Sequence, residues 1–175
     1  MTDQSPVPVT SPRVPATTLS LAGAIVLFDQ VTKALVRADV PLHSSRTLIP
    51  GLLDLTHVQN SGAAFGILNA ADFPYKAAVI ALIATVALVS IAWFAAGLSP
   101  NQRLARLGLA LVLGGAAGNL VDRVTAGYVV DFVDVYWRQY HFWAFNVADS
   151  AITIGVVGMM LDMLGVGNRG STATG

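Results

Sequence analysis

The sequence predicts an all-α integral membrane protein, with four transmembrane helices in a single domain. Of its 175 residues, 54% are hydrophobic and only 11% are charged, whereas a soluble globular domain carries about a quarter charged residues. So few charges cannot cover a surface that faces water. Four long apolar segments are available to face lipid instead.

These four segments differ in how cleanly they match a membrane span. Residues 77–96 contain only two polar side chains, Thr85 and Ser90. At about 1.5 Å per residue, this segment covers a bilayer core of roughly 30 Å. The other three have shorter apolar runs flanked by polar residues, and we expect them over residues 19–36, 104–120 and 145–166. The membrane domain is therefore predicted over residues 19–166.

The segments outside the spans are of three kinds. Residues 1–18 are rich in proline, and we expect them to form a disordered tail, as we do residues 167–175. Residues 97–103 form a short polar turn between the second and third spans. The longer connections, at about 37–75 and 123–144, then lie together on the other side of the membrane. The first contains the alternating stretch LLDLTHVQN after a Pro-Gly turn, which predicts a strand.

Charge does not determine the orientation. If both termini are cytoplasmic, the inner side carries four basic residues, namely Arg13, Arg103, Arg106 and Arg169. The outer side then carries six, namely Lys33, Arg37, Arg46, Lys76, Arg123 and Arg138. The excess of Lys and Arg expected in cytoplasmic loops is therefore not found for this orientation.

The composition also limits the chemistry. The chain contains no cysteine, which excludes disulfides, thiolate catalysis and Cys-ligated zinc. It contains no glutamate, so the H-E-x-x-H motif of metalloproteases cannot occur. The formal net charge is zero and there is no basic run, so no nucleic-acid partner is expected. We likewise expect no metal and no cofactor.

Polar residues recur at places where an apolar environment makes them costly. Asp29 and Lys33 are four residues apart on one helix face, which favours an internal ion pair. In GGAAGNLVDRV, three polar residues are spaced to face one direction, namely Asn119, Asp122 and Arg123. They either hold two elements in register or line a site.

Small residues accompany these polar groups in two motifs. In NSGAAFG, Gly62 and its neighbours allow the backbone to approach another element or a ligand, and Asn60 supplies donors and acceptors. A simple tight turn is compatible with the same residues. In the third span, Gly114 and Gly118 form a G-x-x-x-G pattern, which favours close helix packing.

Two carboxylates at one membrane boundary suggest catalysis. Asp131 is flanked by apolar residues, and Asp149 belongs to a polar stripe of one helix, together with Asn146, Ser150 and Thr153. Each Asp alone is compatible with a helix cap or a paired charge. Two like charges at one boundary instead suggest a dyad that shares one proton. The ionised member can activate water while the protonated member protonates a leaving amine, as peptide hydrolysis requires.

Five sequence blocks, in order, resemble the bacterial lipoprotein signal peptidases, or signal peptidase II. They are DQVTK, NSGAAFG, GNLVDR, VVDF and FNVADSAITIG, and the match extends over about residues 25–158. The resemblance implies a plasma-membrane aspartic endopeptidase with four helices and a small extracytoplasmic β-cradle. Members cut prolipoproteins before a cysteine that carries diacylglycerol. The resemblance places both termini inside and the active site at the outer face.

The same resemblance assigns roles to individual residues. It implies that Asp131 and Asp149 are catalytic and that no metal takes part. Supporting or substrate-binding positions are Asn60, Gly62, Asn119, Asp122, Arg123, Asn146, Asp29 and Lys33. The expected partners are diacylglyceryl-modified prolipoproteins and membrane lipid, and we expect a monomer.

Two other classes of function use similar residues. An ion- or proton-coupled transporter also places Asp, Asn and Lys within membrane spans. Against a transporter, the polar residues gather near one side of the membrane, and the two halves show no inverted repeat. A structural protein could use the same residues only to join its helices. If this were the function, substitutions of these residues would lower stability to different degrees without a selective loss of activity.

Overall fold

The computed structural model describes residues 14–62, 75–98 and 102–165. This part of the chain forms four helices, which are α1 (Ala16–Asp39), α2 (Lys76–Ala96), α3 (Arg103–Thr125) and α4 (Val147–Met163). It also forms four strands, which are β1 (Ser45–Ile49), β2 (Leu53–Asn60), β3 (Val129–Trp137) and β4 (Tyr140–His141). The first helix begins at Ala16, three residues before the predicted start. Most of the two predicted tails, over 1–18 and 167–175, lies outside the described residues.

The combination of membrane helices and a small sheet matches the prediction, and three spans are supported by length and composition. Within the described ranges, α1, α2 and α3 are long and apolar enough to cross a membrane. Helix α4 has 17 residues, at the short end of the lengths that span a bilayer. The predicted fourth crossing, over residues 145–166, therefore stays a prediction.

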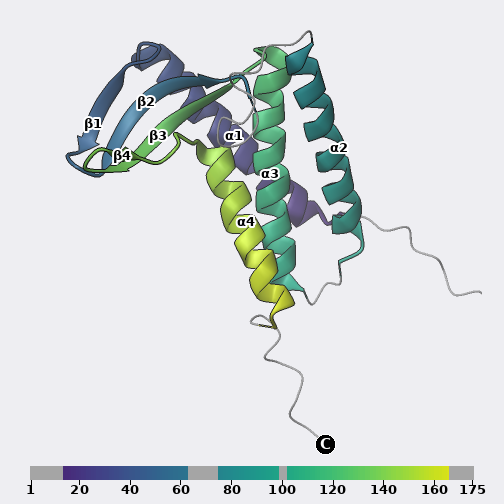
Figure 1. The fold of residues 1–175 in the computed structure, drawn as a ribbon. Coiled ribbons are helices and arrows are strands. Elements are labelled where there is room, and N and C mark those ends of the chain that lie inside the picture. Colours follow the sequence, from purple (N-terminus) through teal and green to yellow (C-terminus); the bar gives the residue numbers. More distant parts are fainter. Residues whose placement is uncertain (1–13, 63–74, 99–101, 166–175) are drawn as a thin grey trace, which may run out of the picture.

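Helix α3 lies at the centre of the bundle and contacts α1, α2 and α4 (Figure 1). Glycines make this possible. A Cβ at Gly114 would lie 2.8 Å from the backbone oxygen of Ala22 in α1. On the α4 side, a Cβ on Gly108 or on Gly155 would overlap the carbonyl oxygen of the other glycine. The close packing predicted from the G-x-x-x-G pattern is confirmed, and a second close approach joins α3 to α4.

Helix α2 presents an apolar surface that little of the described chain covers. Its large side chains are mostly exposed, among them Leu82, Val89 and Trp93. The hydroxyl of Thr85 donates to the carbonyl oxygen of Ala81 at 2.7 Å, and that of Ser90 donates one turn further along in the same way. Both polar groups are therefore satisfied within the helix, as a lipid-facing span requires.

The sheet is antiparallel, has the strand order β1-β2-β3-β4 and lies beside one end of the helices (Figure 1). The predicted Pro-Gly turn joins β1 to β2, and Gly51 adopts a φ of 78° there. Val36 and Val40, at the end of α1, pack against Val130 and Phe132 of β3 in one buried cluster. This cluster fixes β3 on α1. Side chains alternate along a strand, so the residue between Val130 and Phe132 points away from the cluster.

Candidate functional site

The first turn of α4 connects both predicted catalytic carboxylates to one asparagine. Asn146 is fully buried and is the N-cap of α4. Its side-chain oxygen accepts a hydrogen bond from the Asp149 backbone N–H at 2.9 Å, and the Asp149 carboxylate accepts one from the Asn146 N–H at 3.3 Å. This reciprocal pair is a capping box. The Asn146 amide nitrogen also donates to Asp131 at 2.7 Å, so a single residue contacts both carboxylates.

Asp131 comes to this position from β3, on the face opposite the buried cluster. Its side chain is only 3% exposed. The second carboxylate oxygen accepts a hydrogen bond of 3.0 Å from the amide of Asn60, at the end of the neighbouring strand β2. Burial, and next the negative charge of Asp149, raise the pKa of Asp131 to about 6. The hydrogen bonds from Asn60 and Asn146 and the charge of Lys33 oppose this rise.

Asp149 is held from α3 by Asn119. The Asn119 amide nitrogen donates to the Asp149 carboxylate at 2.8 Å. The Asn119 side-chain oxygen accepts hydrogen bonds from Lys33 at 2.9 Å and from Asn146 at 3.2 Å. Asn119 thus orients one carboxylate and connects the pair to the charged residues of α1.

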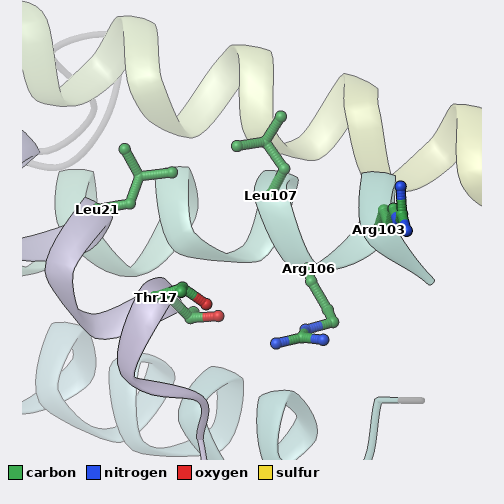
Figure 2. Close-up of a pocket in the computed structure, with 6 residues that line it drawn as sticks. Thr17, Leu21, Arg103, Arg106 and Leu107 are labelled. Atoms are coloured by element: carbon green, nitrogen blue, oxygen red, sulfur yellow. The ribbon is translucent and has the colours of Figure 1, made fainter. Parts of the chain in front are cut away.

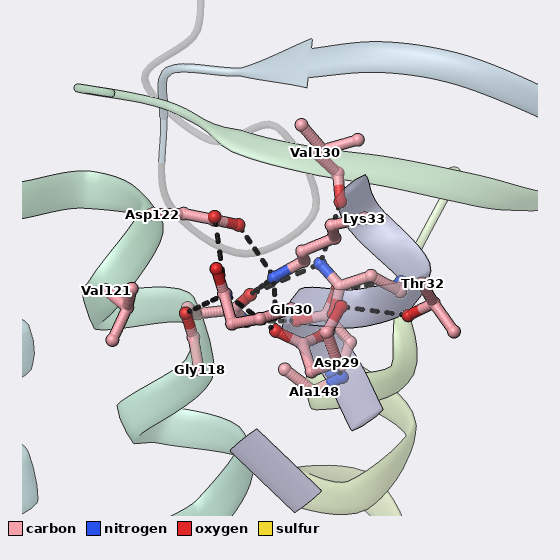
Figure 3. Close-up of polar contacts among 12 residues, drawn as sticks. Asp29, Gln30, Thr32, Lys33, Gly118, Val121, Asp122, Val130 and Ala148 are labelled. Carbon is pink, nitrogen blue, oxygen red and sulfur yellow. Dashed lines mark hydrogen bonds and ion pairs between the residues drawn. The ribbon is translucent and has the colours of Figure 1, made fainter. Parts of the chain in front are cut away.

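Behind the pair lies a buried charge cluster made of Asp29, Lys33 and Asp122 (Figure 3). The ammonium nitrogen of Lys33 lies 2.8 Å from an oxygen of Asp29 and 2.8 Å from an oxygen of Asp122. Asp29 and Lys33 are fully buried, and Asp122 is almost so. The other oxygen of Asp29 accepts a hydrogen bond of 2.9 Å from the Ala148 N–H. The predicted ion pair of Asp29 and Lys33 is confirmed, and the cluster also holds the first turn of α4.

A glycine makes room for this cluster. A Cβ at Gly118 would lie 2.7 Å from the Asp29 carboxylate. Gln30 completes the cluster: its amide donates to the carbonyl oxygen of Gly118 at 3.1 Å and to Asp122 at 3.3 Å. Gln30 was missed by the sequence analysis. The sequence did contain a signal for Gln30, because a polar amide beside Asp29 in an apolar helix needs hydrogen-bond partners.

Arg123 extends from α3 towards another segment, and its charge interacts with those of Asp122, Asp131 and Asp149. One guanidinium nitrogen donates to the backbone oxygen of Asn119, and another donates to that of Gly62, both at 3.3 Å. The Gly62 N–H donates in turn to the Asn60 side chain at 3.0 Å. Arg123 therefore connects α3 to the segment that follows β2. The rest of the NSGAAFG motif lies outside the described residues.

Two members of the polar stripe on α4 do not join the site. The Ser150 hydroxyl donates to the backbone oxygen of Asn146, and the Thr153 hydroxyl donates to that of Asp149. Their spacing is that of the helix, but their hydrogen bonds satisfy the helix itself. The predicted site residues, which did not include these two, all lie in a connected set of contacts around Asp131 and Asp149.

This arrangement has the chemistry of a carboxylate pair rather than of a metal centre. Asp131 is buried, and Asp149 is partly exposed. Three asparagine amides donate to the two carboxylates and none of these donors carries a charge. These neutral donors orient the carboxylates, and the charges of Lys33 and Arg123 nearby offset only part of the repulsion between them.

Comparison with known proteins identifies the family of this chain. Residues 21–165 match the family model described as signal peptidase (SPase) II. The chain belongs to the signal peptidase II family. A lipoprotein signal peptidase of Syntrophotalea carbinolica is 50% identical over 143 residues, which are 82% of this chain and 87% of that protein. One of Geobacter sulfurreducens is 48% identical over 142 residues, or 81% and 87% of the two chains.

Solved structures support the membrane fold of this signal peptidase II family member. A bacterial membrane enzyme matches with a TM-score of 0.78 and 30% sequence identity, over 96% of this chain and 99% of the other. A second structure of that description matches with a TM-score of 0.77 at 30% identity, over 88% and 96% of the two chains. These relatives give no support to the transporter alternative.

Asp134 provides a matched control for the pair. Its odd spacing from Asp131 predicts the opposite face of β3 and a solvent-exposed side chain. Its side chain is in fact only 16% exposed, because it lies 2.8 Å from the ring of His141 on β4. No contact in the described chain joins it to the site. We expect Asp134→Asn to keep cleavage within about threefold of wild type, because it acts at most on sheet stability. If Asp134→Asn lost as much cleavage activity as Asp131→Asn at equal protein level, the assignment of Asp131 rather than Asp134 to catalysis would be wrong.

Proposed function

We propose that the chain is a membrane aspartic endopeptidase that removes signal peptides from prolipoproteins, cutting before the cysteine that carries diacylglycerol. The observation that carries this proposal is the contact of Asn146 with both Asp131 and Asp149. Family membership supports the substrate class, and the carboxylate pair supports the aspartic type of catalysis. One chain supplies both carboxylates, so a monomer is sufficient.

The proposed reaction uses a singly protonated pair. The ionised carboxylate removes a proton from a water molecule, whose oxygen attacks the scissile carbonyl carbon. The protonated partner donates a hydrogen bond to the carbonyl oxygen and stabilises its developing negative charge. The amine leaves when the carbon–nitrogen bond breaks and takes a proton from the pair. Asn60, Asn119 and Asn146 hold the two carboxylates in place throughout.

The position of the pair suits a substrate anchored in lipid. We propose that α4 is the fourth span, since its 17 residues cover about 26 Å. Asp149 then lies at the boundary where α4 enters the membrane, and the sheet lies outside it, on the extracytoplasmic side. The acyl chains of the substrate remain in the bilayer while its peptide segment reaches the pair. Membrane lipid is thus a partner as well as a solvent.

Orientation can be tested with single cysteines, because the chain contains none. We expect Gln139→Cys, in the turn between β3 and β4, to react with an impermeant thiol reagent on intact cells. Gln102→Cys, at the start of α3, is expected to react only after the cells are permeabilised. Labelling in the reverse pattern would place the active site at the cytoplasmic face.

The pH dependence of cleavage follows from Asp131. Its pKa of about 6 lies above the ordinary value of an aspartate, so the free enzyme loses the shared proton as the pH rises through that value. We therefore expect kcat/KM to fall on the alkaline side with an apparent pKa near 6, which belongs to the pair. A profile that is flat from pH 5 to 8, measured with purified protein and one substrate, would contradict a shared proton.

Cleavage of a defined substrate tests the function directly. Purified protein in detergent is incubated with a diacylglyceryl-modified prolipoprotein, and the product is identified by mass spectrometry. We expect one cut, immediately before the modified cysteine. The same precursor without diacylglycerol is the control and should remain uncut. Cleavage elsewhere, or equal cleavage of both precursors, would reject the proposed specificity. Ion uptake by reconstituted vesicles, without cleavage, would favour a transporter.

A further inference from the structure

The carboxylate pair lies at the sheet end of the helices, and so do the side chains that can position it. Figure 2 shows a pocket of about 290 Å³ at the other end, between the first turns of α1 and α3. Arg106, which lines this pocket, precedes Asn119 by 13 residues on α3, so it lies about 20 Å along the helix from the pair. By contrast, β2 carries a buried side chain that the proposed reaction does not use, His57, three residues before Asn60.

His57 is held at three points by the segment that follows α1. Its ring nitrogen Nδ1 lies 2.8 Å from the carbonyl oxygen of Val40, the C-cap residue of α1. Its backbone N–H donates to the carbonyl oxygen of Ser44 at 3.2 Å, and its own carbonyl oxygen accepts from the His43 N–H at 2.9 Å. The last carbonyl groups of a helix have no partner within the helix, and the ring satisfies one of them. These contacts fasten β2 to the end of α1.

The surroundings of the His57 ring determine which nitrogen carries the proton. A carbonyl oxygen only accepts hydrogen bonds, so Nδ1 carries the proton that is donated to Val40. The other ring nitrogen, Nε2, is buried and has no hydrogen-bond partner in the part of the chain that the structure describes. An N–H at Nε2 would be a buried donor without an acceptor, which is costly. The ring therefore acts as a donor at Nδ1 alone.

His57 belongs to a bulge in β2. The register of β2 against β3 shifts between Leu55 and Val58, so that Thr56 and His57 lie together opposite a single residue of β3. Both are only 6% exposed. A bulge of this kind bends its strand and redirects the side chains near it. The ring of His57 therefore anchors the point at which the direction of β2 is set.

The position of the bulge decides which way Asn60 points. Beyond the bulge, Val58 pairs with Asp131 and Asn60 pairs with Val129, so Asn60 shares a face of the sheet with Asp131. Its amide donates to that carboxylate at 3.0 Å. A slip of one residue turns every side chain of a strand to the other face. If the bulge moved by one residue, Asn60 would point away from Asp131.

We propose that His57 is a positioning residue of the carboxylate pair: it fastens the bulge of β2 to the end of α1 and so holds Asn60 against Asp131. This inference rests on the proposed catalytic role of Asp131. The two can fail separately. If the wild-type protein does not cleave, the proposed function fails. If it cleaves and the His57 variants behave as it does, only the role of His57 fails.

Two amide variants test the bond to Val40. The amide nitrogen of asparagine is attached to Cγ, as Nδ1 of histidine is, so His57→Asn can keep the bond. The amide nitrogen of glutamine lies where Nε2 does, so His57→Gln loses it. We expect His57→Asn to cleave within about threefold of wild type and His57→Gln to lose about tenfold in kcat, as one lost hydrogen bond predicts. Equal activity of His57→Gln and wild type, or equal losses in both variants, would overturn the proposal.

The pH dependence of cleavage separates positioning from stability. Burial and the charge of Asp149 raise the pKa of Asp131, and the hydrogen bond from Asn60 opposes this rise. When Asn60 turns away, the opposition is lost, so the alkaline limb of kcat/KM moves to higher pH. The charges of Asp149 and Lys33 beside Asp131 are the same in every variant. We expect one shift shared by His57→Gln and Asn60→Ala, with no further shift in the double variant. A lower Tm with an unmoved limb in His57→Gln would give His57 a purely structural role.

Thr56→Val is the matched control, because Thr56 lies in the same bulge and is equally buried. Its hydroxyl donates to the carbonyl oxygen of Ser44 at 3.2 Å, so the variant loosens the same segment and leaves the bond to Val40 intact. We expect Tm to fall while the alkaline limb stays at its wild-type position. Equal shifts in Thr56→Val and His57→Gln would show that the sheet as a whole, and not His57, positions the pair.

The ring can also be observed in the wild-type protein, where no substitution disturbs the fold. The chain has three histidines, and in protein labelled with ¹⁵N at histidine, the ring resonances that disappear in His57→Asn belong to His57. We expect a proton on Nδ1 and none on Nε2 in nuclear magnetic resonance spectra of the purified protein in detergent. A proton on Nε2 and none on Nδ1 would exclude the bond to Val40 and with it the proposal.

Discussion

Asp131→Asn and Asp149→Asn are each expected to abolish prolipoprotein cleavage, by about 10⁴-fold or more. The reason is that the two carboxylates act as a unit. Each variant leaves one carboxylate and an amide that cannot exchange a proton with it, so neither the activation of water nor the protonation of the amine is completed. The double variant should then be no worse than either single variant. Rates are measured with purified proteins and the diacylglyceryl-modified substrate.

Stability measurements separate this result from simple misfolding. Asparagine has nearly the shape of aspartate. At position 131 it removes both the cost of burying a charge and the repulsion from Asp149. Against this gain, the new amide meets the donors of Asn60 and Asn146, which had bonded to a carboxylate. We expect Tm to change by only a few degrees. Cleavage by either variant at near the wild-type rate would reject the dyad, and an unstable but partly active Asp131→Asn would favour a structural charge pair.

The features of the fold that the sequence predicted correctly depend on local patterns. Apolar runs gave the helices over 16–39, 76–96 and 103–125 to within a few residues. Alternation after a Pro-Gly turn gave β2. The i, i+4 spacing of Asp29 and Lys33 gave their ion pair, because both residues lie on one helix. Each of these features is decided by neighbours in the chain.

The features that the sequence did not predict depend on contacts between distant segments. Asp122 pairs with Lys33 across 89 positions of the chain, and no local pattern shows that α1 and α3 are adjacent there. The spacing put Arg123 on one helix face with Asn119, but it did not show that Arg123 reaches the backbone of Gly62 on another segment. In each case tertiary packing selected one of several partners that the sequence allowed.

Lys33→Met is expected to destabilise the protein more than any change at the carboxylate pair, by about 3–5 kcal/mol. Its ammonium group lies 2.8 Å from both Asp29 and Asp122, and the side chain is fully buried. Without it, two carboxylates would remain buried beside each other with no cation between them. Methionine has a similar volume, so the loss reflects charge rather than packing. We expect Tm in detergent to fall by about 10 °C or more.

Activity should fall together with stability, for a geometric reason. Asp29 also accepts the Ala148 N–H, and Lys33 also donates to Asn119, so both the first turn of α4 and the orientation of Asp149 depend on the cluster. Arg37→Gln is the matched control: its guanidinium lies 3.6 Å from Asp122 and the side chain is 34% exposed, so its removal should cost about 1 kcal/mol or less. Replacing both acids by Asn in the Lys33→Met background should restore much of the Tm. If Lys33→Met unfolds no more easily than Arg37→Gln, the cluster does not hold the fold together.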